Sequence, residues 1–388
     1  MNHSPVIGQV CQQRLLISGE SMGDDAVNTP KVSVIMPSLN VAAYIRECLE
    51  SAVKQSLRDI EIICVDAGST DGTEEILKEY AEKDARIHFI HSDVKSYGYQ
   101  MNLGLDAARG EYIGVLETDD WVEPEAFETL WETARANDAD VVMANYFWYT
   151  TRDGVCNKPV ENLKNCPYNK VFTPLEEREL YKVTPSIWSG IYRRELLSES
   201  NIRFNETPGA SFQDTSFHFM VCTAARRCCL LNRYFLHYRR DNEGSSVHSK
   251  GKIFCVSDEA HYFEAFLERR PSDRQKLAQF WQALKYEKYR WNFERLDEES
   301  RQVFVRLMCA EFLAAREAGT LEKACFTPED WIAVNQLISR PERYCRMSFF
   351  WSRERKGAVR RLYGMLRDYG LCATLCSVGQ KIQKRDFR

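Results

Sequence analysis

The sequence predicts an α/β fold in which a mostly parallel sheet is flanked by helices and followed by a helical C-terminal region. Five short runs rich in β-branched residues alternate with helical patterns, and they begin 28, 27, 25 and 28 residues apart. This spacing is typical of repeated β–α units, in which each crossover helix returns the chain to a parallel sheet. Beyond about residue 250 the strand-like runs stop and long helical patterns replace them.

The five runs are short and almost wholly apolar, as expected for strands that are buried on both faces. In chain order they are Val32–Met36, Ile60–Val65, Ile87–Ile90, Tyr112–Leu116 and Asp140–Asn145. We expect these segments to form a mostly parallel sheet.

Helix signals lie between the predicted strands. An apolar face over residues 44–52 predicts a helix that starts near Asn40. Asp71 and Glu74 have the spacing of a capping box for the next helix. Pro124 suits the first turn of the helix that follows the fourth strand. These patterns predict crossover helices.

The 388 residues exceed the usual length of one domain, so we expect more than one. We divide the chain into an N-terminal extension (1–30), an α/β domain (31–248) and a helical C-terminal domain with a basic tail (249–388). The helical patterns of the last part include Ala260–Leu267, Leu277–Tyr289 and Val303–Ala315.

The composition, 44% hydrophobic and 28% charged, is that of a globular protein. The net charge of −4 conceals an asymmetry. Residues 343–388 contain 12 Lys and Arg against 3 Asp and Glu, which gives +9 there and −13 in residues 1–342. An acidic body without a recognised binding module argues against nucleic acid as a partner.

The sequence predicts a cytoplasmic chain. No run approaches the roughly 18 apolar residues of a membrane-spanning helix, and the N-terminus lacks the basic-then-apolar pattern of a signal peptide. The 14 cysteines are scattered without a CxxC motif, as expected for buried thiols in a reducing compartment.

Polar segments follow four of the predicted strands, at residues 37–40, 66–72, 91–93 and 117–120. Because ligands of open parallel sheets bind beyond the carboxyl ends of the strands, we expect these segments to meet at one edge. Neither the GxGxxG nor the GxxxxGK[ST] phosphate-binding motif occurs in the sequence.

Three carboxylates, Glu117, Asp119 and Asp120, stand within four residues at the end of the fourth strand. A hard divalent cation with oxygen ligands would relieve their mutual repulsion. The alternative is a solvated turn that caps the next helix. The cluster alone leaves both interpretations open.

Five segments resemble, in order and spacing, the successive motifs of family 2 glycosyltransferases with the Rossmann-like GT-A fold. They are VSVIMPSLN (32–40), VDAGSTDGT (65–73), ARGEYIGVLETDDW (108–121), GIYRRELL (190–197) and FQDTSF (212–217). The resemblance covers roughly residues 31–245. It implies metal-dependent transfer of a hexosyl group from a nucleotide diphosphate donor, commonly UDP-linked, with inversion at the anomeric carbon and with Mg²⁺ or Mn²⁺.

The resemblance implies that the nucleotide lies at the ends of the first two strands. Pro37, Ser38 and Asn40 stand where family members hold the nucleotide, and Asp66 matches the acid that accepts a hydrogen bond from the base. The alternative for Asp66 is to cap the following helix. The family often has a second acid where this chain has Ala67.

Glu117-Thr118-Asp119 matches the DxD motif of the family, with Glu in the first acidic position. The resemblance implies that Asp119 ligates the metal and that Glu117 approaches the ribose or a metal-bound water. It implies that Asp120 orders either the loop or the acceptor. A cation at this place stabilises the charge of the departing nucleotide diphosphate.

Asp214 occupies the position of the catalytic base of the family, although the preceding residue is Gln213 rather than the usual Glu. The base takes the proton of the attacking acceptor hydroxyl. The alternative is an ordinary aspartate at the start of a helix.

Four further positions match the family less closely. Trp188 resembles the acceptor-side wall, with core packing as the alternative. Arg239 lies in a segment that looks like a lid over the donor diphosphate, with a plain linker as the alternative. Lys95 and Asn102 match a donor-contacting segment, although the usual Arg of that segment is Met101 here.

The implied partners are a nucleotide-sugar donor and a glycan or lipid-linked acceptor. Because family members often act on membrane-bound acceptors, the basic tail predicts a peripheral position at the inner face of the membrane. A homo-oligomer interface is the alternative for the tail, and both interpretations stay open.

Two other functions compete with sugar transfer in the synthesis of a surface polysaccharide or glycolipid. A sugar-phosphate nucleotidyltransferase has a similar sheet but needs a glycine-rich N-terminal loop with a basic residue, which residues 34–40 lack. A non-catalytic scaffold would explain the departures at positions 67, 117 and 213, whereas retention of the other motif acids argues against it.

Overall fold

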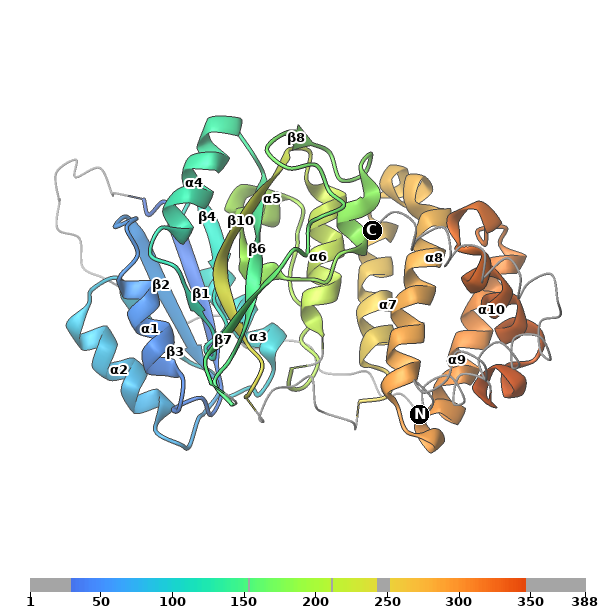
Figure 1. Cartoon of the computed structure of the whole chain (residues 1–388), viewed down its shortest axis with the longest axis horizontal. Coiled ribbons are helices and arrows are strands. Elements are labelled where there is room, and N and C mark those ends of the chain that lie inside the picture. Colours follow the sequence, from blue (N-terminus) through green and yellow to red (C-terminus); the bar gives the residue numbers. More distant parts are fainter. Residues whose placement is uncertain (1–28, 153, 211, 243–251, 347–388) are drawn as a thin grey trace, which may run out of the picture.

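The structure is a computed structural model that describes residues 29–152, 154–210, 212–242 and 252–346. It has an α/β half, on the left in Figure 1, and a helical half on the right, with helix α6 between them. The boundary that we predict at residue 248 lies outside the described residues, as do the basic tail from residue 347 onward and nearly all of the predicted extension.

One mixed sheet runs through the α/β half. Its strands lie in the order β3-β2-β1-β4-β9-β6-β10-β5, with β7 paired to β6 and β8 paired to β10. Their bounds are β1 Val32–Ser38, β2 Ile60–Asp66, β3 Ile87–His91, β4 Tyr112–Val115, β5 Trp121–Val122, β6 Val141–Thr150, β7 Cys156–Val160, β8 Val171–Phe172, β9 Gly190–Arg193 and β10 Cys228–Arg239.

All five predicted strands are present, as β1, β2, β3, β4 and β6. β1 pairs in parallel with β2 and β4, and β2 pairs in parallel with β3. Every position of β1 and β2 is buried, because helices cover both faces of the sheet. The α/β fold is therefore confirmed.

The remaining strands lie outside the predicted runs. β9 is inserted antiparallel between β4 and β6, and β10 pairs in parallel with β6. β5 and β8 have two residues each, which is too short for a periodic signal. The prediction that Arg239 belongs to a lid loop is wrong: it ends β10, where β6 supplies a backbone partner as far as Tyr149.

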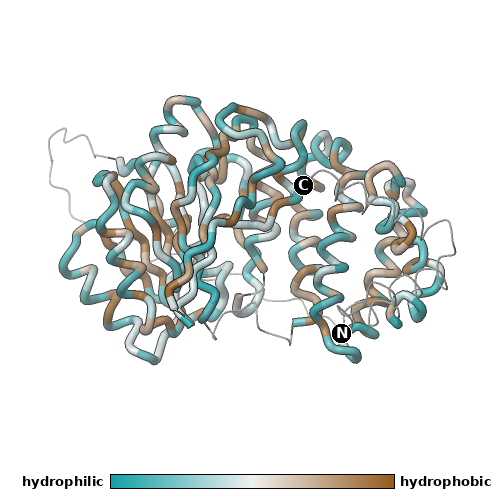
Figure 2. The backbone as a smooth tube through the Cα atoms, in the orientation of Figure 1, coloured by the Kyte–Doolittle hydropathy of each residue, from teal (hydrophilic) through white to brown (hydrophobic). Residues whose placement is uncertain are grey.

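Helices cover the two faces of the sheet and form the helical half. Their bounds are α1 Ile45–Val53, α2 Thr73–Lys83, α3 Tyr97–Ala107, α4 Ala126–Asn137, α5 Arg194–Glu199, α6 Gln213–Ala224, α7 Cys255–Glu268, α8 Pro271–Arg295, α9 Glu298–Glu317 and α10 Pro328–Ser339. α1, α2 and α4 share a core with one face, and α3, α5 and α6 share a core with the other. Figure 2 shows hydrophobic strands between helices whose outer surfaces are hydrophilic. In the described part of the chain, no helix is both long and apolar enough to cross a bilayer.

Two helix starts differ in detail from the sequence prediction. α1 begins at Ile45 rather than near Asn40, which lies in a turn with a φ of 53°. Asp71 accepts a hydrogen bond from the backbone N–H of Thr73 at 3.1 Å, but the N-cap position of α2 is Gly72. Glu74 makes an ion pair along the helix and closes no capping box.

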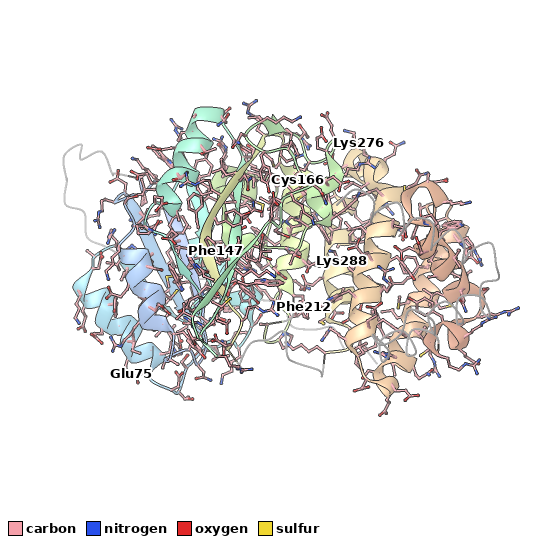
Figure 3. The ribbon with its side chains drawn as sticks, viewed as in Figure 1. Glu75, Phe147, Cys166, Phe212, Lys276 and Lys288 are labelled. Atoms are coloured by element: carbon pink, nitrogen blue, oxygen red, sulfur yellow. The ribbon has the colours of Figure 1, made fainter. Side chains whose placement is uncertain are left out.

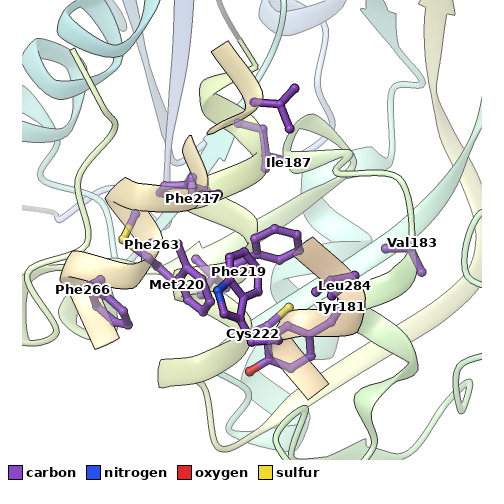
Figure 4. Close-up of a cluster of buried hydrophobic side chains, with 14 of the residues drawn as sticks. Tyr181, Val183, Ile187, Phe217, Phe219, Met220, Cys222, Phe263, Phe266 and Leu284 are labelled. Atoms are coloured by element: carbon purple, nitrogen blue, oxygen red, sulfur yellow. The ribbon is translucent and has the colours of Figure 1, made fainter. Parts of the chain in front are cut away.

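The helical half shares its core with the sheet through α6. Residues 216–224 of α6 are all buried. Figure 4 shows Phe217, Phe219 and Met220 of α6 in the same cluster as Phe263 of α7, and the rings of Phe219 and Phe263 lie 5.5 Å apart. One hydrophobic cluster therefore continues from the sheet into α7, α8 and α9.

Replacing Phe263 by alanine tests this shared core. The side chain is fully buried and its ring lies 4.7 Å from that of Trp281, so we expect the free energy of unfolding to fall by about 3–5 kcal/mol. Hydrogen exchange should report this loss in β1 as well as in α8. Val303→Ala, at an exposed position, is the control and should leave both unchanged. Loss of protection in α8 alone would contradict a shared core.

Candidate active site

The carboxyl ends of the parallel strands bring the predicted polar segments together. Ser38 is aligned with Asp66 in the β1–β2 ladder, and Asp66 with His91 in the β2–β3 ladder. Thr118, which follows β4, donates from its hydroxyl to the carbonyl oxygen of Pro37 at 2.8 Å. The predicted convergence at one edge of the sheet is confirmed.

Asp66 anchors the loop that follows β2. Its carboxylate is fully buried and accepts hydrogen bonds from Ser38 Oγ at 3.0 Å, from Ser69 Oγ at 2.6 Å and from the backbone N–H of Ser69 at 2.8 Å. Three protein donors occupy most of the acceptor positions of a carboxylate. These bonds hold the loop after β2 in place, and the contact of Asp66 with the base stays a prediction.

Short polar contacts fix the two loops at this edge to each other and to α3. The backbone N–H of Asn40 donates to Ser69 Oγ at 2.8 Å, and its side-chain oxygen accepts from the backbone N–H of Thr70 at 2.9 Å. Gln100 of α3 donates to the carbonyl oxygen of Ser38 at 2.8 Å. No motif pointed to Gln100, because a buried glutamine in a helix has no sequence signature of its own.

Glu117 lies in the floor of the site. Its Oε1 accepts a hydrogen bond from the hydroxyl of Tyr97 at 2.7 Å. Burial, with the nearby charges of Asp119 and Asp214, raises the pKa of Glu117 to about 8. The charge of Asp214 therefore acts on Glu117 although 97 residues separate them in the sequence.

Asp120 is deeper still, with 1% of its surface exposed. Its Oδ1 accepts from the backbone N–H of Arg239 at 2.8 Å, whereas Oδ2 has no hydrogen-bond partner among the described residues. Burial and the charge of Asp119 raise the pKa of Asp120 well above its usual range. Of its two predicted roles, this burial supports ordering of the loop, and the acceptor-side role stays a prediction.

The acid cluster fits a divalent cation. Asp120 contributes a buried carboxylate oxygen without a donor, and the carboxylate of Asp119 is only partly buried beside it. Asp119 Oδ2 accepts from the amide of Asn242 at 2.8 Å, which helps to orient it. Carboxylate oxygens of this kind are the ligands that Mg²⁺ and Mn²⁺ prefer, and a cation would give their charges a partner.

Arg239 is held by the protein on several sides. Its Nε donates to the carbonyl oxygen of Asp119 at 2.8 Å, and its Nη2 forms an ion pair with Glu47 of α1. The guanidinium also lies over the rings of Tyr44 and Tyr149. With 7% of the residue exposed, Arg239 braces the acid loop against α1. Its contact with the donor diphosphate stays a prediction.

Asn102 ties α3 to the segment that precedes α6. Its amide donates to the carbonyl oxygen of Phe204 at 3.0 Å and to Glu206 at 2.8 Å, and its oxygen accepts from the N–H of Phe204 at 2.9 Å. These bonds hold residues 204–206 against α3, and the donor contact of Asn102 stays a prediction. Lys95, exposed just before α3, stays a prediction.

Asp214 lies in the first turn of α6. Burial raises its pKa to about 6, while hydrogen bonds from Thr215 and the positive charge of Lys288 act in the opposite direction. A carboxylate of this kind is ionised at neutral pH and still accepts a proton readily. The site therefore contains an acid suited to proton abstraction at the position that the sequence predicts.

Helix α8 supports the turn that presents Asp214. The ring of Phe212 meets that of Trp291 edge to face at 5.2 Å, and Arg295 lies over the same Phe212 ring. Lys288 stands one turn before Trp291 in α8, and Figure 3 labels both Lys288 and Phe212 in the region between the two halves. Among the described residues, Lys288 forms an ion pair with the adjacent Glu287, at 4.0 Å.

Glu259 of α7 is a site-supporting residue that the sequence analysis missed. It is buried, accepts from the amide of Asn205 at 2.9 Å, and hydrogen-bonds the hydroxyl of Ser216, two residues from Asp214. Burial raises its pKa to about 8. One signal was available, since Glu259 shares the apolar face of its helix with Phe263.

Trp188 belongs to an aromatic wall beside the acids. It stacks on Tyr238 at 5.2 Å with an interplanar angle of 8°, and it meets Tyr146 edge to face at 4.6 Å. Burial and the charges of Asp120 and Asp119 raise the pKa of Tyr238. The wall therefore borders the acid cluster.

The geometry agrees with three comparisons with known proteins. Residues 33–200 match the model of Glycosyl transferase family 2. Glycosyltransferase GlyG of Streptococcus pneumoniae is 40% identical over 239 residues, which are 60% of this chain and 78% of GlyG. The chain belongs to glycosyltransferase family 2. The family that the five motifs predict is confirmed.

Two further comparisons show how much of the chain is covered. The uncharacterized glycosyltransferase EpsJ of Bacillus subtilis is 34% identical over 218 residues, and the match spans 55% of this chain but only 62% of EpsJ. A crystal structure of S. aureus TarS (1–349) in complex with UDP-GlcNAc superposes with a TM-score of 0.56 at 18% identity, over 82% of this chain and 90% of that chain. The TarS superposition supports the GT-A-like fold.

The neutral form of Glu259 gives a test by stability. Because its pKa is about 8, folding at pH 7 protonates a side chain that is ionised in the unfolded chain, where the usual value is 4.5. Glu259→Gln removes this proton uptake and should raise the free energy of unfolding at pH 7 by on the order of 1–3 kcal/mol. The gain should vanish below about pH 4, where both states are protonated.

Urea titrations at pH 7 and pH 4 measure the difference. Glu268→Gln, on the exposed face of the same helix, is the matched control and should change neither value. A Gln variant that is less stable than the wild type at pH 7 would show that Glu259 is ionised in the folded protein.

Proposed function

We propose that this chain transfers a hexosyl group from a nucleotide diphosphate donor to a hydroxyl of a glycan or lipid-linked acceptor, with inversion at the anomeric carbon, in surface polysaccharide synthesis. The observation that carries the proposal is that the first turn of α6 places Asp214 where its charge acts on Glu117, the first acid of the cluster after β4. Membership in family 2 supports the same activity.

The donor nucleotide is proposed to lie against the loops at residues 37–40 and 67–71, beside Lys95. The contacts of Asn40 with Ser69 and Thr70 give these loops one fixed arrangement before any ligand binds. TarS, which has a similar fold, has been crystallised with UDP-GlcNAc. This makes UDP the first nucleotide to test.

Asp119 and Asp120 are the residues that would hold Mg²⁺ or Mn²⁺. When bound, the cation supplies positive charge that stabilises the departing nucleotide diphosphate. Arg239 keeps the cation loop in place through the carbonyl oxygen of Asp119 and through Oδ1 of Asp120. The charge of Arg239 is itself paired with that of Glu47.

Asp214 is proposed as the base. The acceptor oxygen forms a bond to the anomeric carbon while the bond from that carbon to the diphosphate oxygen breaks, and the hydroxyl proton passes to the carboxylate of Asp214. Attack from the face opposite the leaving group inverts the configuration. Trp188 borders the place where the acceptor must stand.

Asp119→Ala should abolish metal-dependent nucleotide binding, because it removes the most accessible carboxylate of the cluster. Calorimetric titration with UDP in the presence of Mn²⁺ and then of EDTA measures this loss. Asp93→Ala removes a carboxylate that is 97% exposed at the end of β3 and is the control. If wild-type protein bound no nucleoside diphosphate with Mn²⁺, the non-catalytic scaffold would be the better function.

Asp214→Asn should lower kcat by about 10²–10⁴-fold and leave UDP affinity within twofold, because it removes only the base. In the wild type the rate should fall as pH drops through about 6, where Asp214 gains a proton.

Lys288→Met removes a charge that favours the ionised carboxylate of Asp214. The pH at which the rate falls on the acid side should therefore move up by about 0.5–1 pH unit. Lys276→Met, exposed on the same helix, should leave it unchanged. A wild-type rate that is flat between pH 5 and 8 would exclude Asp214 as the base.

A further inference from the structure

The aromatic wall continues to the protein surface as a row of side chains across three strands. Lys158 of β7 is aligned with Trp148 of β6, and Trp148 is aligned with Tyr238 of β10. Trp188 stacks on the Tyr238 ring, and Arg240 follows β10 directly. We name these five residues, Lys158, Trp148, Tyr238, Trp188 and Arg240, the aromatic–basic track.

The members of the track lie on one face of the sheet. Alternate residues of a strand point to the same side, so Tyr238 and Arg240 share a face, as do Tyr146 and Trp148. Ring contacts place both pairs on the same side: Tyr146 meets Tyr238 at 6.4 Å, and the Arg240 guanidinium lies 5.1 Å from the centre of the Trp148 ring. The track therefore runs from the acid cluster outward without crossing the sheet.

The outer end of the track is exposed and positively charged. Trp148 is 39% exposed, and Lys158 Nζ lies 5.9 Å from its ring on the side of β7. Within the described part of the chain, neither Arg240 nor Lys158 forms an ion pair, whereas the neighbouring Arg239 is paired with Glu47. Two cations that contact Trp148 without an ion-pair partner among the described residues give this spot positive charge, on a body whose residues 1–342 carry a net charge of −13.

The fold does not require this combination. A lysine on an edge strand such as β7 discourages pairing with other chains, which accounts for Lys158 alone. Trp148 lies on β6, which is paired on both sides along this stretch, and burying it or making it polar would serve the sheet equally well. A ring with a cation on either side suits a sugar with an anionic group, because sugar C–H surfaces pack on aromatic faces and Arg pairs with carboxylates or phosphates in bidentate fashion.

We propose that the aromatic–basic track binds an anionic glycan acceptor, with a sugar ring on Trp148 and the carboxylate or phosphate of the chain between Arg240 and Lys158. The inference rests on the proposed sugar transfer, since it defines the acceptor class of that same site. The inner end, at Tyr238 and Trp188, leads the acceptor terminus to Asp214 and the acid cluster.

Direct binding to the full-length protein tests the track without any donor. The probes are a glucuronate hexamer, the same hexamer with its carboxyl groups reduced, and an oligo(ribitol phosphate). We expect at least one anionic oligomer to bind ten or more times as tightly as the reduced hexamer, and more weakly as salt rises. The oligomer that binds better identifies the anion as carboxylate or phosphate.

Single substitutions assign this binding to the track. Arg240→Gln and Lys158→Gln should each weaken binding of the anionic oligomer by about 3–10-fold and leave the reduced hexamer unaffected. Trp148→Ala should weaken binding of both, and Trp148→Phe should restore part of it. Lys170→Gln, exposed beside the amino end of β10, is the matched control and should bind as the wild type does.

Three results would overturn the inference: equal binding of charged and reduced hexamers, no binding of either anionic oligomer, or binding that Arg240→Gln and Lys158→Gln leave intact. Arg240-dependent binding to phosphatidylglycerol vesicles in place of the oligomers would instead assign the cations to a lipid surface. UDP titration of the wild type and of the same variants separates the two proposals. If the wild type binds no UDP, the proposed sugar transfer is wrong. If only the aromatic–basic track is wrong, UDP binding is unchanged.

Discussion

The position of α6 between the sheet and the helical half is the constraint on which the site depends. Its residues 216–224 are all buried, so the helix can neither rotate nor slide without breaking contacts on two sides. Its first turn consequently emerges at the same edge as the acid cluster after β4. Asp214 is thus brought to Glu117 by apolar packing rather than by any attraction, because the two carboxylates would repel each other if both were ionised, and this raises the pKa of Glu117.

The helical half compensates for that repulsion. Glu259 binds the first turn of α6 through Ser216 and, being neutral below about pH 8, adds no charge of its own. Lys288 supplies a positive charge that favours the ionised form of Asp214. The charge of Asp214 also acts on groups from both halves of the molecule, namely Tyr97, Glu117, Tyr192, Glu259 and Lys288. The C-terminal helices α7 and α8 therefore contribute to the candidate active site.

The sequence allowed prediction of the elements whose burial is complete and of the residues whose motifs are local. β1 and β2 are apolar throughout because both faces are covered, and the order of the motifs indicated the family. Motif position does not reveal the partners of a side chain, however. Asn102 and Arg239 stand where donor contacts were expected, yet Glu206 and Glu47, distant in sequence, engage them. Glu259 acts through a contact that only the folded chain creates.

The adjacent arginines at the end of β10 illustrate why register matters more than composition here. Arg239 points to one face of the strand, where Glu47 and the carbonyl oxygen of Asp119 satisfy it. Arg240, one residue later, points to the opposite face and lies over Trp148. A shift of one residue in the register of β10 would exchange the positions of the two arginines. The charge beneath the acid loop would then lack its ion-pair partner. The pleat of one strand thus separates the residue that supports the catalytic loop from the residue that is free to bind a charged acceptor.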